Sequence, residues 1–305
     1  AGLAAALAPS APALIAARLF QALGGCAGLV LGRAIVRDLA APGEAARRLA
    51  LMNLLVTAGP SVAPLVGSLL ASALGWRAIF YALCTLGVIN FLLALRLLPE
   101  TNRTATAIDA RTLMRHYRQL ALSPTFLGFA IGGGCATTSM YAFVASAPFV
   151  FTGQLNRPPH EAGVYLALMV SGVWLGSGLA SRLVARVALT PLLVGANLLS
   201  VGAAFVFLGA VLTQTLSVPL VVCAMFVLTL GTGIAAPAAL TQSISVNPQV
   251  IGSAAGLYGF IQMTVGALCT AFAGMGKDPA LSAAIVLSVA GIVSQLGFWI
   301  ATRQR

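Results

Sequence analysis

Charge is scarce in this chain, and negative charge is the scarcest. The 305 residues include six Asp and Glu and 17 Lys and Arg, so charged side chains make up 8% of the total and hydrophobic ones 59%. A soluble globular domain typically has about 25% charged residues. The composition therefore excludes an ordinary soluble domain. Long uncharged stretches separate short arginine-bearing segments, which indicates a helical protein that crosses a membrane several times.

Residues that commonly carry catalysis or bind metals are also scarce. The two histidines, His116 and His160, fall in different hydrophilic segments, with no second histidine near either one. Cysteines fall only inside apolar stretches, without Cys-x-x-Cys spacing, and we interpret them as small apolar residues: Cys26, Cys84, Cys135, Cys223 and Cys269. No nucleophile with a base and no metal cluster is expected at bilayer depth, so the sequence predicts that the protein is not an enzyme.

The uncharged stretches are long enough to cross a bilayer as helices. A span needs about 20 apolar residues, and a helix satisfies its own backbone hydrogen bonds, which an open sheet cannot do in lipid. We predict an all-α membrane protein with nine complete spans, at 12–32, 47–73, 77–98, 124–151, 162–186, 189–212, 217–240, 251–275 and 279–302. Residues 1–9 are apolar but shorter than half a span, and no basic segment of a signal peptide precedes them. We expect them to be the stub of a tenth helix in an N-terminally truncated chain.

Positive residues are divided unequally between the two sets of alternate loops. One set contains Arg77, Arg157 and Lys277, and Arg18 lies inside a span. The other set contains 13 arginines: Arg33, Arg37, Arg47, Arg48, Arg96, Arg103, Arg111, Arg115, Arg118, Arg182, Arg186, Arg303 and Arg305. Because cytoplasmic loops retain Lys and Arg, this second set and the C-terminus are predicted to be cytoplasmic. The same topology accounts for the net charge of +11 without a nucleic-acid partner.

The longest hydrophilic stretch, 99–123, divides the chain unevenly. Its second half has an apolar helical face with Leu113, Tyr117 and Leu120, and a basic face with Arg111, Arg115 and Arg118. This pattern predicts a helix lying on the inner membrane surface. The expected parts are therefore the remainder of an N-terminal six-helix half at 1–98, a cytoplasmic loop with an interfacial helix at 99–123, and a C-terminal six-helix half at 124–305.

One predicted span carries a polar group followed by a ridge of glycines. Arg18 and Gln21 lie on one helical face with Gly25, Gly28 and Gly32, and this ridge permits the close approach of another helix. Arg18 lies on the order of 10 Å inside the span. Burying a guanidinium there costs at least about 2.5–3.5 kcal/mol, so we expect it to face a cavity or a partner. The alternative is that Arg18 extends to the outer interface.

This span also resembles the fourth helix of Major Facilitator Superfamily drug-efflux proteins. Its core, Arg18-x-x-Gln21-x-x-Gly24, matches that family's motif B, and the run Gly-Arg-Ala-Ile-Val-Arg-Asp at 32–38 resembles the Bcr/CflA (bicyclomycin and chloramphenicol resistance) subfamily. The resemblance implies a major facilitator-type helical bundle in which the first two helices and most of the third are missing from this chain.

The next span resembles the antiporter motif C, GxxxGPxxGG. Its residues 59–68 read Gly-Pro-Ser-Val-Ala-Pro-Leu-Val-Gly-Ser, so small residues replace two glycines of the motif. Pro60 and Pro64 each remove a backbone hydrogen bond, while Gly59, Ala63 and Gly67 permit close packing. The resemblance implies a seal between the two halves. The alternative is an ordinary kinked span.

Polar and aromatic side chains in other spans are candidates for the substrate pathway. They are Asn53, Thr57, Tyr141, Trp174, Tyr258 and Gln262, with Thr137, Thr138 and Thr232 as further candidates. Each is also compatible with packing or interhelical hydrogen bonding.

The resemblance implies a monomeric drug:proton antiporter of the bacterial inner membrane. Its partners would be the lipid bilayer, protons and a small amphipathic antibiotic or metabolite, and the proton gradient would replace any cofactor. All six acids of the chain lie in loops or at span ends, and in this family the proton-carrying acid usually lies on the first helix. Two alternatives are a sugar or metabolite exporter of the same superfamily and a non-transporting truncated remnant.

Overall fold

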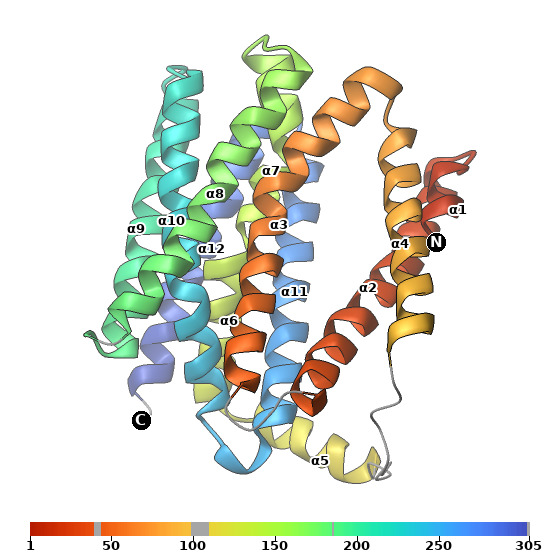
Figure 1. The fold of residues 1–305 in the computed structure, drawn as a ribbon. Helices are drawn as coiled ribbons and strands as arrows, with labels where there is room; N and C mark the ends of the chain where they lie inside the picture. Colours follow the sequence, from red (N-terminus) through yellow and green to blue (C-terminus); the bar gives the residue numbers. More distant parts are fainter. Residues whose placement is uncertain (40–43, 99–109, 185, 304–305) are drawn as a thin grey trace. The chain divides into compact units, whose positions relative to one another are not determined.

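The computed structural model describes residues 1–39, 44–98, 110–184 and 186–303, and these contain helices and no strand (Figure 1). The chain divides into two compact units, Ala1–Ala107 and Ile108–Arg305. Each unit has its own helix contacts.

The first unit contains four helices: α1 (Gly2–Ala6), α2 (Ala11–Leu39), α3 (Ala45–Leu74) and α4 (Arg77–Leu97). The short α1 packs against α4, where a β-carbon added to Gly2 would lie 3.2 Å from the α-carbon of Cys84. Gly75 ends α3 with a φ of 83°, a conformation that glycine adopts without steric cost, and α4 begins two residues later.

The second unit is a helical bundle with one helix across its end (Figure 1). Its elements are α5 (Ala110–Ala121), α6 (Pro124–Thr138), α7 (Met140–Phe149), the π-helical η1 (Val150–Gln154), α8 (Pro159–Leu183), α9 (Leu189–Leu212), α10 (Val218–Ile244), the short η2 (Pro248–Val250), α11 (Ile251–Met275) and α12 (Pro279–Arg303). Helix α10 packs against α8 and α9, while α6 packs against α10, α11 and α12. Proline lies in the first turn of α6, α8, α10 and α12, where its missing N–H has no helical partner to lose.

Glycines bring the helices of this bundle into backbone contact. A β-carbon added to Gly128 of α6 would lie 2.6 Å from the carbonyl oxygen of Gly297 on α12. One turn later, the Ser294 hydroxyl donates a hydrogen bond of 2.8 Å to the carbonyl oxygen of Gly132. On α8, Gly172 and Gly176 pack in the same way against the backbone of α10. Small residues spaced by four thus replace side-chain packing at these two helix crossings.

Each predicted span overlaps one or more helices, although the number of spans stays a prediction. Seven helices of the described residues are long and apolar enough to cross a membrane: Arg77–Leu97, Pro124–Gln154, Pro159–Leu183, Leu189–Leu212, Val218–Ile244, Ile251–Met275 and Pro279–Arg303. The predicted spans 12–32 and 47–73 fall on α2 and α3. Some side chains of these two helices are not among those that the structure describes.

The span predicted at 124–151 is a single apolar segment, Pro124–Gln154, but its helix is irregular at two places. At Ser139, which separates α6 from α7 and which we call the break after α6, the regular hydrogen bonding is interrupted while φ and ψ stay helical at −58° and −29°, and η1 continues the segment to Gln154. Two causes are local. Thr137 and Thr138 each donate a side-chain hydrogen bond to a carbonyl oxygen four residues earlier, which bends helices. Pro148 inside α7 lacks a backbone N–H, and the π-helix begins two residues later.

Candidate functional site

Arg18 and Gln21 form a contact in the first unit. An Nη1 atom of Arg18 donates a hydrogen bond of 2.6 Å to Oε1 of Gln21, one turn further along α2. The guanidinium carbon lies 5.7 Å from the centre of the Phe80 ring on α4, within the range of a cation–π contact. Among the described residues, no carboxylate lies within 4 Å of Arg18. The arginine therefore has an amide and an aromatic neighbour, with donors left for another group.

The glycine ridge beyond Arg18 is open within the described residues. A β-carbon added to Gly24, Gly25, Gly28 or Gly32 would meet no described atom within 4 Å. The close approach of another helix to this ridge stays a prediction.

The motif C segment has one weak neighbour contact in the described part of the chain. A β-carbon added to Gly67 would lie 4.0 Å from Ile79 Cδ1, and one added to Gly59 would meet no described atom. Helix α3 continues through both prolines; Ala63 is exposed and Pro64 half-buried. The side chains of three candidates, Asn53, Thr57 and Pro60, lie outside the described residues.

Three helices of the second unit place polar side chains around the break after α6. Gln262 of α11 donates from Nε2 to the Thr137 hydroxyl at 2.7 Å, and the Thr138 hydroxyl donates to the backbone oxygen of Gln262 at 2.9 Å. From α10, the Thr232 hydroxyl donates to the carbonyl oxygen of Ala136 at 3.1 Å. The last turn of α6 is therefore held by side chains of α10 and α11 through polar contacts.

Two tyrosines adjoin this polar group: Tyr258 on α11 and Tyr141 on α7. Tyr258 lies one turn before Gln262, is 2% exposed, and covers Gly133, where an added β-carbon would lie 2.9 Å from its hydroxyl oxygen. The hydroxyl lies beside that of Thr137, and no hydrogen bond of ordinary geometry joins the two. Tyr141 is 38% exposed and borders Gly266, one turn after Gln262. We call these four residues, Thr137, Tyr141, Tyr258 and Gln262, the break cluster.

A buried tyrosine hydroxyl without a partner is uncommon. Leaving such a group unsatisfied costs about 1–3 kcal/mol. The break cluster thus combines an unused hydroxyl, an amide and an exposed aromatic ring beside an interrupted helix. A few convergent polar groups in apolar surroundings are typical of substrate sites.

Trp174 is not brought to this cluster. It lies on α8 and is 42% exposed, and in the described part of the chain no hydrogen bond or ring contact joins it to α6, α7 or α11.

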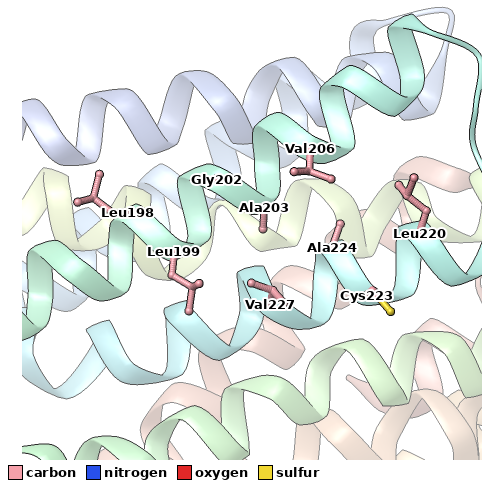
Figure 2. Close-up of a pocket in the computed structure, with 9 residues that line it drawn as sticks. All are labelled: Leu198, Leu199, Gly202, Ala203, Val206, Leu220, Cys223, Ala224 and Val227. Atoms are coloured by element: carbon pink, nitrogen blue, oxygen red, sulfur yellow. The ribbon is translucent and has the colours of Figure 1, made fainter.

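Two grooves of the second unit are mainly apolar. Figure 2 shows the groove between α9 and α10, with a volume of about 480 Å³. It is lined by Leu198, Leu199, Gly202, Ala203, Val206, Leu220, Cys223, Ala224 and Val227. Because no polar side chain other than the Cys223 thiol borders it, the groove offers nothing to orient a polar substrate. A second groove, of about 540 Å³, lies mainly between α11 and α12.

Some structurally important residues were not identified from the sequence. The small-xxx-small spacing is visible in the sequence at Gly128 and Gly132 and again at Gly172 and Gly176. Asn197, 1% exposed on α9, donates from Nδ2 to the Gly291 carbonyl oxygen of α12 at 3.4 Å. An asparagine within an otherwise apolar span is a signal in itself.

Comparisons with known proteins agree with this architecture. A model of the Major Facilitator Superfamily matches residues 1–271. A solved structure described as a bacterial homologue of the human lysosomal transporter Spinster, in an inward-facing and occupied conformation, has a TM-score of 0.69. The match covers 100% of this chain and 80% of that one at 17% sequence identity, so it supports the fold alone.

Three curated relatives that match most of this chain are bacterial proteins. The uncharacterized MFS-type transporter YdgK of Bacillus subtilis is 26% identical, over 98% of this chain and 75% of that protein. The bicyclomycin resistance protein homolog of Haemophilus influenzae is 25% identical, over 94% and 73%. The multidrug resistance protein MdtL of Shewanella oneidensis is 26% identical, over 91% and 70%. With the family match over most of its length, this chain belongs to the Major Facilitator Superfamily of membrane transporters.

Proposed function

We propose that the protein is a drug:proton antiporter of the Bcr/CflA type, which exports small amphipathic compounds across the bacterial inner membrane. Family membership, the names of two relatives and the motif B residues support this proposal. In this account, the protein works as a monomer, needs no cofactor, and draws its energy from the proton gradient.

The geometry of Arg18 is the observation that carries the proposal. Its exposed guanidinium projects from an apolar helix, donates to Gln21, lies within cation–π range of Phe80, and keeps donors for another group. An arginine beside a carboxylate stabilises the ionised form and lowers the pKa of that acid. If Arg18 approaches a proton-carrying carboxylate in one conformation and leaves it in another, proton release is coupled to the conformational change.

The break cluster is our proposed substrate site. The exposed ring of Tyr141 offers an apolar surface, the Gln262 amide is half-buried, and the Tyr258 hydroxyl is free to bond a substrate group when the helices move. These features suit an amphipathic molecule with an apolar body and a few polar groups.

Replacing Tyr258 with phenylalanine tests this site. Because the hydroxyl makes no hydrogen bond of ordinary geometry within the protein, Tyr258→Phe is expected to change thermal stability little. If the hydroxyl bonds substrate, the KM for transport should rise about fivefold, the equivalent of one neutral hydrogen bond. The matched control is Tyr165→Phe, whose hydroxyl donates to Glu161 on α8. An unchanged KM for Tyr258→Phe would leave this hydroxyl outside the site.

The proposed orientation places the C-terminus in the cytoplasm and Arg157 and His160 outside. In a variant without native cysteines, Arg157→Cys is expected to react with a membrane-impermeant maleimide applied to spheroplasts. Arg303→Cys should react only after permeabilisation. Labelling with the reverse pattern would overturn the orientation.

The function itself can be tested in cells. Expression from the complete reading frame, in a host lacking its own multidrug exporters, should raise the inhibitory concentration of bicyclomycin or chloramphenicol and lower their accumulation. A protonophore should abolish the difference in accumulation. Resistance without lower accumulation would contradict export, and transport of sugars alone would reassign the substrate class.

A further inference from the structure

Helix α5 is docked onto the bundle by its apolar face. Leu120 is 1% exposed and belongs to the same core cluster as Phe126 of α6 and Ala254 of α11. The Tyr117 hydroxyl lies 3.6 Å from the position of a β-carbon on Gly256. Only two residues separate α5 from α6, and the Ser123 side chain caps α6 by accepting a hydrogen bond from the Phe126 amide at 3.3 Å. The helix therefore has a fixed orientation on the second unit.

The opposite face of α5 combines positive charge with exposed apolar groups. At 100° per residue, Met114, Arg115 and Arg118 occupy an arc of about 100°. Leu122, the first residue after α5, falls within this arc because its amide still bonds to the Arg118 carbonyl oxygen at 3.1 Å. Met114 is 67% and Leu122 71% exposed, and both arginines are exposed. No carboxylate of the described residues lies within ion-pair distance of Arg115 or Arg118. We call these four residues the basic face.

The described acids of this unit lie at the other end of the bundle. The Asp278 carboxylate accepts hydrogen bonds from the Leu281 amide at 3.0 Å and from Gln154 at 2.8 Å. These bonds, the Leu281 amide first, hold the pKa of Asp278 below its usual value. Glu161 begins α8 at the same end and accepts the Tyr165 hydroxyl. Helix α5 lies at the opposite end of the bundle, just before the start of α6 (Figure 1). Neither acid can therefore neutralise the arginines of α5.

Further arginines lie at the ends of α8 and α12 that are remote from these acids. Arg182 is in the last turn of α8, and Arg303 ends α12 with its guanidinium carbon 4.0 Å from the centre of the Trp299 ring. Retention of positive loops explains the sign of this charge. It does not explain why two arginines and two large apolar side chains share one exposed face of a docked helix.

We propose that the basic face of α5 binds anionic phospholipid headgroups of the membrane leaflet at this end of the bundle. Guanidinium groups donate paired hydrogen bonds to phosphate oxygens, while Met114 and Leu122 enter the boundary between headgroups and acyl chains. The surface is distinct from the proposed substrate site. Its assignment to the cytoplasmic leaflet rests on the proposed orientation, whereas its preference for anionic lipid does not.

The test is competition between lipids for the purified full-length protein in detergent. Native mass spectrometry with equal amounts of phosphatidylglycerol and phosphatidylcholine should show preferential retention of phosphatidylglycerol. The variant Arg115→Gln/Arg118→Gln should lose at least fivefold of that preference, the equivalent of about 1 kcal/mol for one arginine at an anionic surface. Since micelles have no leaflets and the assay needs no transport, its outcome is independent of the proposed orientation and function.

A double variant at the other end, Arg157→Gln/Lys277→Gln, is the matched control because it removes the same charge. It should retain the preference of the wild-type protein. Monodisperse elution and unchanged circular dichroism establish that both variants are folded. Equal preference in the α5 variant and the wild type, or an equal loss in the control, would overturn the assignment.

Discussion

Arg18→Ala is expected to abolish proton-driven export while leaving the protein in the membrane. Its guanidinium is oriented toward Gln21 at 2.6 Å and contacts only one other described group, the Phe80 ring. Removing it takes away the proposed partner of the proton-carrying carboxylate, whose pKa would then rise toward or above its usual value. The measurement is the initial rate of drug uptake into inverted vesicles under an imposed pH gradient.

Arg18→Lys is the informative control. Lysine keeps the charge but lacks the planar fork, so transport should be impaired to an intermediate degree, roughly tenfold slower than with arginine. Equal amounts of each variant in the membrane must be shown by immunoblot. Normal uptake by Arg18→Ala would reduce this arginine to a residue that anchors the helix at the interface.

Gly176→Leu is expected to disrupt the second unit. A β-carbon at this position would collide with the carbonyl oxygen of Leu230 and lie 3.1 Å from the α-carbon of Gly233, so the side chain would meet backbone that cannot rotate away. Overpacking of this kind costs roughly 1–3 kcal/mol, or more where backbones must separate. The melting temperature measured by tryptophan fluorescence should fall by several degrees, with low yield and loss of transport.

The same helix supplies a matched control for this substitution. Gly178 is exposed, and a β-carbon there would meet no described atom within 4 Å. Gly178→Leu inserts the same side chain into α8 with the same gain in helix propensity, and its melting temperature should be no lower than that of the wild type. Equal destabilisation by the two variants would mean that close packing of α8 on α10 does not stabilise the fold.

Helix positions and local contacts were predictable from the sequence. Apolar runs locate helices because a span must satisfy its own backbone. The Arg18–Gln21 bond is predictable because residues three apart face one another on any helix. The break at Ser139 was not predicted, since hydropathy measures composition along 124–151 and ignores hydroxyls that bond carbonyl oxygens within the helix.

Contacts between helices that are far apart in the sequence were harder to predict. Tyr141, Tyr258 and Gln262 were predicted one by one as pathway candidates, but nothing in their spacing brings α7 to α11. Trp174 met the same criteria, and the structure leaves it apart from them. The Gly128–Gly132 pair could have been found from its spacing, yet its partner Gly297 could not, because any neighbouring helix satisfies the pattern.

The most direct test of the proposed antiport is proton movement driven by substrate. Purified full-length protein, reconstituted into liposomes that contain a pH-sensitive dye, is given chloramphenicol or bicyclomycin without any imposed gradient. The account predicts a change in internal pH that depends on drug and protein and is absent with Arg18→Ala. Drug movement without any accompanying proton movement would contradict the coupling.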